Sequence, residues 1–382
     1  MSKFVHQPSY YLDDKDLSDL FESQSVAPRF LLRMARRRGL FLSEKASRDD
    51  LVRAICMAPV SWDEINAIAE AINTEDREGN RMTKRLSGSL ELEAVPAALE
   101  RVKAWLESKG DVPTLTRTSD SSFKLECRFV EIQLQRARPL QRVERQVVVD
   151  VEIVRGRVDL RYSEHDRARE IVRKLSEEIP NKADETKSER SVTLWSVREA
   201  QTRIRFFTEL INGVEGFLLS GVSDLHLDRR FPEVDCADAS NGVPEGRGRR
   251  RKELEGLVKH AVLYGDSLLK SDFYLELKAS GYYIGSVKWT AVERGVGRRQ
   301  VEFFAGFKDP IEAKDFLFDV RRVCRRDKDG DYDKGERPNV FEKPALLRLV
   351  EAAAYRAMDE LEAEGVPRNS MATTSATRLH SP

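Results

Sequence analysis

Apolar residues recur at two different spacings along the chain, and the change in spacing separates a helical part from a part rich in strands. From Pro28 to about residue 110 the apolar positions follow helical spacing, as in Leu51, Val52 and Ile55. From Phe123 onward apolar and polar residues alternate, which predicts strands. The pattern therefore predicts an α+β fold, with a small helical N-terminal domain followed by a mixed, mainly antiparallel β-sheet with helices.

Local signals predict where the individual elements lie. Short helices are expected over 30–38 and 47–55, and a third begins at the capping box formed by Ser61 and Glu64. Further helices are predicted at about 92–108, 163–179, 195–210, 251–263, 271–279 and 344–364. Strands are predicted at about 123–129, 147–153, 158–162, 216–227, 282–292, 300–307 and 316–323. No internal repeat is recognisable in the sequence.

Segments rich in polar residues, proline and glycine predict the boundaries between domains. Segments 180–191 and 232–250 are expected to be exposed loops or linkers. Together these features predict a flexible arm at 1–27, a helical domain at 28–110, an α+β domain at 114–231, a basic α+β domain with a C-terminal helix at 246–366, and a tail at 367–382.

Composition and charge exclude only a few classes of function. The 382 residues include 65 Lys or Arg and 65 Asp or Glu, so attraction for nucleic acid must come from local clusters of charge. The four cysteines lie far apart, which argues against a zinc ribbon or a disulfide framework. No stretch has the apolar length of a signal peptide or a membrane span. We therefore expect a cytoplasmic protein without a membrane partner.

The segment Ala35–Ile55, "ARRRGLFLSEKASRDDLVRAI", contains the strongest functional motif. A basic helix stops at Gly39, an extended loop follows, and Ser47 can cap a second helix. This order resembles the SAP-like helix-extended-loop-helix module over residues 28–57. The resemblance implies that Lys45 and Arg48 contact nucleic-acid phosphates, and that Arg36, Arg37 and Arg38 form a basic flank. A hairpin that docks on a protein, or serves only as a scaffold, remains the alternative.

A second basic region lies nearer the C-terminus. Residues 247–326 contain 18 Lys or Arg against 11 Asp or Glu, a net charge of +7. The candidate nucleic-acid-binding residues here are Arg249, Arg250, Arg251, Arg298 and Arg299. Aromatic residues in the hairpin that contains the last two could stack on exposed bases, or they could pack in the core.

Catalytic signals are weak. Asp272, Glu276 and Lys278 resemble the carboxylate and Glu-x-Lys set that holds Mg²⁺ in one large nuclease class, although Ser271 and Asp272 also read as the start of a helix. The aspartates at 327–333 are more typical of a charged turn than of a calcium loop. The histidines are dispersed, so no metal site and no cofactor is predicted.

The sequence therefore favours a non-catalytic protein that binds DNA or RNA. Its setting could be a bacterial regulator or an accessory subunit of a defence or mobile-element system. A Mg²⁺-dependent nuclease centred on Glu276 and Lys278 is the alternative, as is a protein-interaction subunit without nucleic-acid contact.

Overall fold

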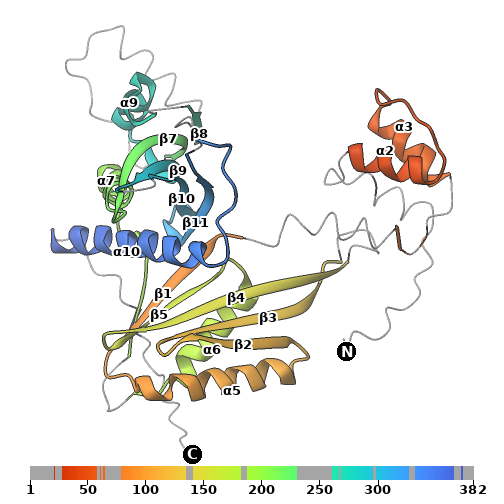
Figure 1. Cartoon of the computed structure of the whole chain (residues 1–382). Coiled ribbons are helices and arrows are strands. Elements are labelled where there is room, and N and C mark those ends of the chain that lie inside the picture. The colour runs from red at the N-terminus through yellow and green to blue at the C-terminus, as the bar shows by residue number, and fades with distance from the viewer. Residues whose placement is uncertain are drawn as a thin grey trace, which may run out of the picture. The chain divides into compact units, whose positions relative to one another are not determined.

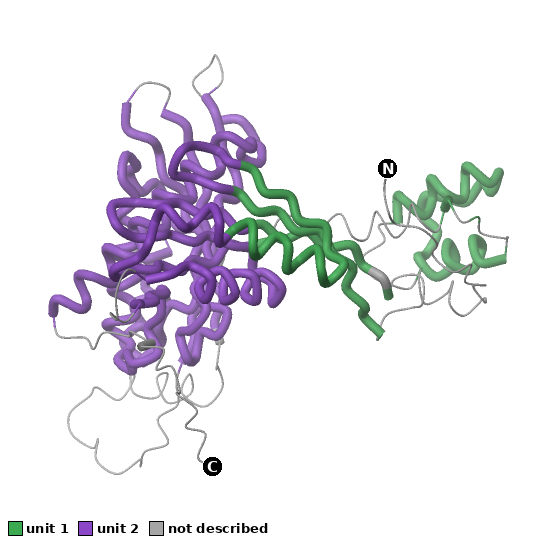
Figure 2. Tube along the Cα trace, turned by 90° about the horizontal axis from the view of Figure 1, so that it is seen from below, with its two compact units in different colours: residues 1–79, 99–116, 124–148 green, residues 80–98, 117–123, 149–382 purple. Residues whose placement is uncertain are grey.

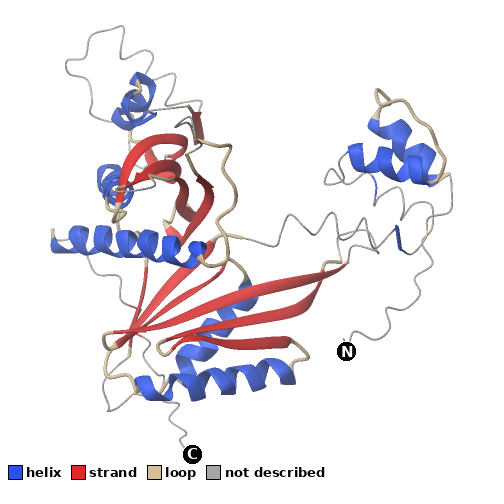
Figure 3. Cartoon of the chain, in the orientation of Figure 1, coloured by secondary structure: helices blue, strands red, loops and turns tan. Residues whose placement is uncertain are grey.

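The computed structural model describes residues 21, 28–57, 61, 63–64, 79–134, 141–181, 187–229, 260–265, 268–295, 298–326, 332–364 and 371–372. These residues form helices and a mainly antiparallel sheet (Figures 1 and 3), so the predicted α+β class is confirmed. The predicted arm at 1–27, apart from Phe21, and the predicted tail, apart from residues 371–372, lie outside the described residues.

The chain divides into two compact units (Figure 2). The first comprises residues 1–79, 99–116 and 124–148, and the second comprises residues 80–98, 117–123 and 149–382. The units alternate along the sequence because α5, β2, β3 and β4 each contribute residues to both. These elements span Val95–Ser108, Val112–Ser119, Ser122–Ile132 and Arg142–Val154. The domain boundaries inferred from the sequence stay predictions.

The first unit contains a helical hairpin and a group of strands. The hairpin consists of α2 (Pro28–Arg37) and α3 (Arg48–Cys56). The strands follow the order β2, β3 and β4, where β2 spans Val112–Ser119. Along β3, Phe123, Leu125, Cys127 and Phe129 are buried and their neighbours face outward, as the alternating pattern predicts.

The second unit is built on an antiparallel sheet with the strand order β5-β1-β11-β10-β9-β7-β8, and the end of β4 pairs with β5. Strand β6 pairs with both β1 and β12. The strands span Arg81–Ser87 (β1), Arg157–Ser163 (β5), Ser188–Ser191 (β6), Phe217–Asp228 (β7), His260–Tyr264 (β8), Tyr283–Glu293 (β9), Gln300–Asp309 (β10), Lys314–Cys324 (β11) and Met371–Ala372 (β12). The helices are α6 (Asp166–Glu178), α7 (Ala200–Asn212), α9 (Asp272–Ala279) and α10 (Glu342–Ala363), with short 3₁₀ turns at Leu92–Ala94 and Leu268–Lys270.

Aromatic side chains dominate the larger core of the second unit. Trp289 and Phe303 stack with their ring centroids 5.4 Å apart. Phe206 of α7 meets Phe307 and Phe316 at 5.9 Å each. Because α7 and α10 cover this face of the sheet, the aromatic residues that the sequence left open for base stacking are mainly core residues (Figure 1).

A tight hairpin turn joins β4 to β5. Arg155 and Gly156 both have positive φ, 41° and 85°, which tight hairpin turns require. Glycine adopts this conformation without steric cost. The turn sets the register of β4 against β5, beginning with Val154 opposite Arg157.

Five of the described strands, β1, β2, β6, β8 and β12, do not appear among the sequence predictions, and none of them shows a clear apolar alternation. β1 has polar residues on a face that becomes buried, β2 is largely exposed, and β6 reads Ser-Glu-Arg-Ser within a segment predicted to be a linker. The helix predicted at 251–263 is wrong at its end, because residues 260–264 form β8. The helix predicted from residue 195 begins at Ala200.

The order of elements repeats once along the chain, although the sequence shows no repeat. A strand, a helix, four strands and a helix occur as β1-α5-β2-β3-β4-β5-α6. The same order recurs as β6-α7-β7-β9-β10-β11-α10, with β8 and α9 inserted after β7. The repetition concerns the order of the elements.

Candidate nucleic-acid interface

The SAP-like segment folds as a hairpin with the predicted start and stop signals. The first helix ends at Gly39, whose φ is 74°, and the Leu40 N–H donates to the Ala35 carbonyl at 2.9 Å. The Ser47 hydroxyl oxygen caps α3 by accepting the Asp50 N–H at 3.2 Å. The two helices bury a small shared core, whose fully or nearly fully buried members are Phe21, Leu31, Met34, Ala35, Leu51, Val52 and Ile55.

Arg38 belongs to the framework of this hairpin. Its guanidinium donates to both carboxylate oxygens of Glu64, at 2.6 and 2.8 Å, and to the Ile55 carbonyl at 3.1 Å. The hydrogen bonds from Arg38 lower the pKa of Glu64 to about 2. Glu64 also accepts the Ser61 N–H at 2.9 Å, which completes the predicted capping box. A side chain with these partners is not available to a phosphate.

Arg48 is also occupied by the protein itself. It donates to the Phe21 carbonyl at 2.8 Å and ties that buried residue to the start of α3. Asp50 accepts a hydrogen bond from the Ser47 hydroxyl at 2.7 Å, and both it and Asp49 are exposed beside the N-terminus of α3. These carboxylates complement the positive end of the helix dipole and would oppose a phosphate there.

The exposed cations of the hairpin lie instead along the outer side of α2. Arg29, Arg33, Arg36 and Arg37 are all exposed, and their spacing places them within about 100° of one another around the helix. We call these four residues the arginine face. No acidic residue occurs in α2, and Glu44 is the acidic partner of Arg36 at 2.8 Å. That pair is mostly exposed on both sides, so it is weak.

The sequence predicts nucleic-acid contacts for Arg36, Arg37 and Lys45 but does not single out Arg29 and Arg33. The signal that would have found them is the recurrence of arginine at positions i, i+4 and i+8 of a helix whose other side is apolar. Lys45 is exposed in the loop before α3. Phe41, in the same loop, is 88% exposed, which is unusual for a phenylalanine.

The structure describes two residues of the second predicted cluster of cations, and one of them is engaged with acids. Arg299 forms ion pairs with Glu293 at 2.7 Å and with Glu342. Arg298 is exposed in the hairpin turn with a φ of 32°. Arg249, Arg250 and Arg251 lie outside the described residues. The described part of this region therefore offers fewer exposed unpaired cations than its net charge indicates.

The three residues of the nuclease alternative lie on α9, which begins where the capping pattern predicts. The Ser271 hydroxyl accepts the Tyr274 N–H at 3.3 Å. Asp272 and Glu276 are exposed one turn apart, while Lys278 lies about 200° around the helix from Glu276. The helix therefore does not bring the lysine beside both carboxylates.

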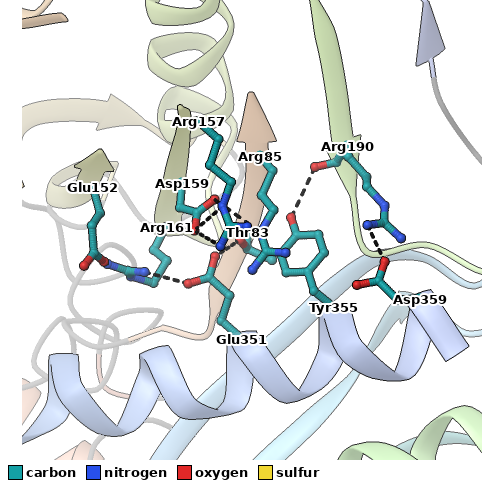
Figure 4. A network of polar contacts seen from close by, with 10 residues as sticks. All are labelled: Thr83, Arg85, Glu152, Arg157, Asp159, Arg161, Arg190, Glu351, Tyr355 and Asp359. Carbon is teal, nitrogen blue, oxygen red and sulfur yellow. Dashed lines mark hydrogen bonds and ion pairs between the residues drawn. The ribbon is translucent and has the colours of Figure 1, made fainter. Parts of the chain in front are cut away.

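A different group of charged residues is buried in the second unit, where α10 crosses β1 and β5 (Figure 4). Antiparallel pairing places Thr83 beside Arg161. The Arg161 guanidinium donates to Glu351 at 2.6 Å and to Glu152 at 2.5 Å, and the Thr83 hydroxyl donates to the other oxygen of Glu351. Burial raises the pKa of Glu351, while Arg161 and Thr83 act in the opposite direction. We call the residues drawn in Figure 4 the buried network.

The buried network continues along β1 toward the end of α10. Arg85 and Asp159 are register partners, with Arg85 Nε 3.2 Å from Asp159 Oδ1. The Arg85 guanidinium also lies 3.4 Å from the centre of the Tyr355 ring, and the Tyr355 hydroxyl donates to the Arg190 carbonyl at 3.2 Å. Most of these groups are paired within the protein, although Arg85 Nε and Arg190 Nη2 are buried without a hydrogen bond to the described residues. The network therefore supports the fold and does not present a reactive group to solvent.

No protein-family model matches the chain, and no curated protein matches it. Within the part of the chain that the structure describes, no helix is long and apolar enough to cross a bilayer. No group of three or more His, Cys, Asp or Glu residues among those residues is arranged to hold a metal ion.

Proposed function

We propose that this chain is a non-catalytic nucleic-acid-binding protein whose main contact surface is the arginine face of α2. The observation that carries the proposal is the presence of four exposed arginines on one side of a helix that has no acidic residue. Arg29 and Arg37 are about 12 Å apart along the helix axis, so the arginine face can reach several phosphates of one backbone. A bacterial regulator or a defence accessory subunit is the proposed setting.

The proposal keeps the SAP-like interpretation of the hairpin but moves the contacts from α3 to α2. Support comes from the difference between neighbouring side chains, because Arg38 and Arg48 bind the protein while Arg36 and Arg37 face solvent. Residues 28–57 contain eight cationic and three acidic residues, a net charge of +5. This local excess can attract a polyanion even though the whole chain is neutral.

The exposed Phe41 extends the proposal to unpaired strands. An aromatic ring next to a basic surface can stack on a base that is not held in a duplex. Phe41 lies two residues after Gly39, in the loop that leads from the C-terminal end of the arginine face to α3. We therefore propose that single-stranded nucleic acid binds more tightly than duplex.

Fluorescence anisotropy of the full chain with labelled single-stranded and duplex DNA and RNA tests the proposal. The variant replaces Arg29, Arg33, Arg36 and Arg37 by Gln, which keeps long side chains that helices tolerate. We expect an affinity loss of tenfold or more and a decrease of up to about three units in the slope of log affinity against log salt, because fewer counterions are released. Phe41→Ala should weaken single-strand binding by about tenfold or more and duplex binding much less.

A matched control has the same loss of net charge at another surface. Arg173, Arg198, Arg294 and Arg337 are exposed residues of the second unit. Replacing these four by Gln should leave both affinity and salt slope close to those of the parent. Equal losses in the two quadruple variants would show that binding follows net charge alone. A parent chain that does not bind any of the probes would leave the hairpin as a docking element.

A further inference from the structure

A cavity of about 430 Å³ lies in the second unit, between α6, β6 and the starts of β1 and β11. Its volume is in the range of sites that bind small organic molecules. Much of its lining is apolar or aromatic, contributed by Met82, Tyr162, Val172, Val192, Trp195 and Phe316. Residues of the hairpin take no part in it, so the cavity is separate from the proposed nucleic-acid surface.

Tyr162 supplies a polar group inside this cavity. The residue is 5% exposed, and no hydrogen bond joins its hydroxyl to another residue that the structure describes. Burial raises the pKa of Tyr162 to about 12, and the charged groups that act on it are Arg169, Asp315 and Glu189. All three line the cavity together with Tyr162 itself. Because the hydroxyl makes no hydrogen bond to the residues that the structure describes, it can donate one to a molecule bound in the cavity.

The charges around the cavity are mostly neutralised by one another. Lys84 pairs with Glu189 at 2.7 Å, and Arg169 pairs with Asp315 at 2.9 Å. The third cation of the lining is Lys314, which is half exposed and forms a loose ion pair with Glu312, 3.7 Å from its ammonium and outside the lining. The lining therefore carries a net charge of +1 from three cations and two carboxylates.

Trp195 and Lys314 together form the accessible edge of the cavity. Trp195 is 48% exposed, which is high for tryptophan, and the Lys314 ammonium lies 5.9 Å from the centre of its ring. A flat ring next to an ammonium is suited to a molecule that has an aromatic system and an acidic group.

From this arrangement we propose that the cavity binds a small planar aromatic molecule with a single negative charge, of the aromatic carboxylate or sulfonate class. The aromatic part is held by Phe316, Val172 and Trp195, an acceptor atom receives the Tyr162 hydroxyl hydrogen, and the acidic group meets Lys314. The site is independent of the proposed nucleic-acid surface, and its test uses no nucleic acid.

The probe is 8-anilino-1-naphthalenesulfonate, titrated into the full chain while its fluorescence is followed. The uncharged N-phenyl-1-naphthylamine has the same rings without the sulfonate. We expect saturable binding of one sulfonate probe per chain, and weaker binding of the uncharged compound. Tyr162→Phe removes only the hydroxyl and should weaken probe binding about fivefold. Lys314→Gln should weaken the sulfonate about fivefold or more and leave the uncharged compound unaffected.

Matched controls distinguish the cavity from general effects of the substitutions. Tyr274→Phe changes another buried tyrosine, and Lys308→Gln changes a lysine with almost the same exposure as Lys314 (49% against 50%). Neither lines the cavity, so neither should change probe binding. Thermal unfolding of each variant shows whether it is folded. The proposal is overturned if binding is not saturable, if Tyr162→Phe and Lys314→Gln bind as the parent does, or if the controls lose as much affinity.

Discussion

The helical hairpin and the buried network both depend on arginine, but the two regions place it in opposite environments. In the hairpin, four arginines of α2 face solvent on a helix without acids. In the network, Arg161 is 4% exposed and is bonded to two carboxylates. A buried cation must be paired, because removing it from water costs several kcal/mol. Arginine content alone therefore does not reveal a binding surface, and the position of the nearest carboxylate separates the two cases.

The contrast also occurs between adjacent residues. Arg37 is exposed at the end of α2, whereas the Arg38 side chain is 10% exposed and bonded to Glu64. Arg37 can therefore contact a ligand, whereas its neighbour Arg38 supports the structure of the hairpin. The difference arises because consecutive residues of a helix point about 100° apart.

The largest expected effect is in the buried network. Glu351→Ala leaves the buried Arg161 without one of its two carboxylate partners and Thr83 without its acceptor. We expect a loss of about 3–5 kcal/mol in the free energy of unfolding, measured by urea denaturation of the full chain. Glu360→Ala, an exposed position on the same helix, is the control and should have little effect. A similar loss in both variants would show that helix propensity, and not the network, is responsible.

A smaller effect is expected from the adjacent arginines of the hairpin. Arg38→Gln removes the two hydrogen bonds to Glu64 and the one to the Ile55 carbonyl. The hairpin should lose about 2 kcal/mol of local stability, measured by hydrogen exchange of α3 amides. Arg37→Gln should leave this protection unchanged but contribute to loss of nucleic-acid binding. If the α3 amides of the two variants are equally protected from exchange, Arg38 does not stabilise the hairpin in the way that its contacts indicate.

The smallest effect is a pH dependence that has opposite sign in the two regions. The folded pKa of Glu64 is lowered from 4.5 to about 2 by Arg38, so its contribution is present above pH 4.5 and is lost as pH falls toward 2. Burial raises the folded pKa of Glu351 above 4.5, so its contribution is complete below 4.5 and is lost as pH rises through the folded value.

Hydrogen exchange at several pH values, corrected for the intrinsic exchange rate, measures both dependences. The Glu64→Gln variant should lose the acid-dependent decrease in α3 protection, an effect of about 1 kcal/mol. The Glu351→Gln variant should lose the decrease in β1 protection that accompanies rising pH. Retention of the parental pH dependence in either variant would assign it to other groups.

Features with a local cause were predictable from the sequence. The stop at Gly39, the caps at Ser47 and Ser61, and the turn at Gly156 each depend on residues within a few positions. The strands of the aromatic core follow from alternation over short windows. These signals are sufficient to predict the α+β class. Each helix or strand has a hydrophobic face that must be buried, and this requirement does not depend on which element covers it.

Only the tertiary structure decided which charged residues are paired inside the protein and which face solvent. Glu64 is 26 positions from Arg38, and Glu351 is 268 positions from Thr83, so no local pattern relates them. The same holds for β1. Its sequence shows no apolar alternation, and its polar face is buried only because α10 packs over it. The cavity likewise combines β1, α6, β6 and β11, which are separated along the chain. Local sequence determines the conformation of each segment, whereas pairing of charge and enclosure of space depend on contacts between distant segments.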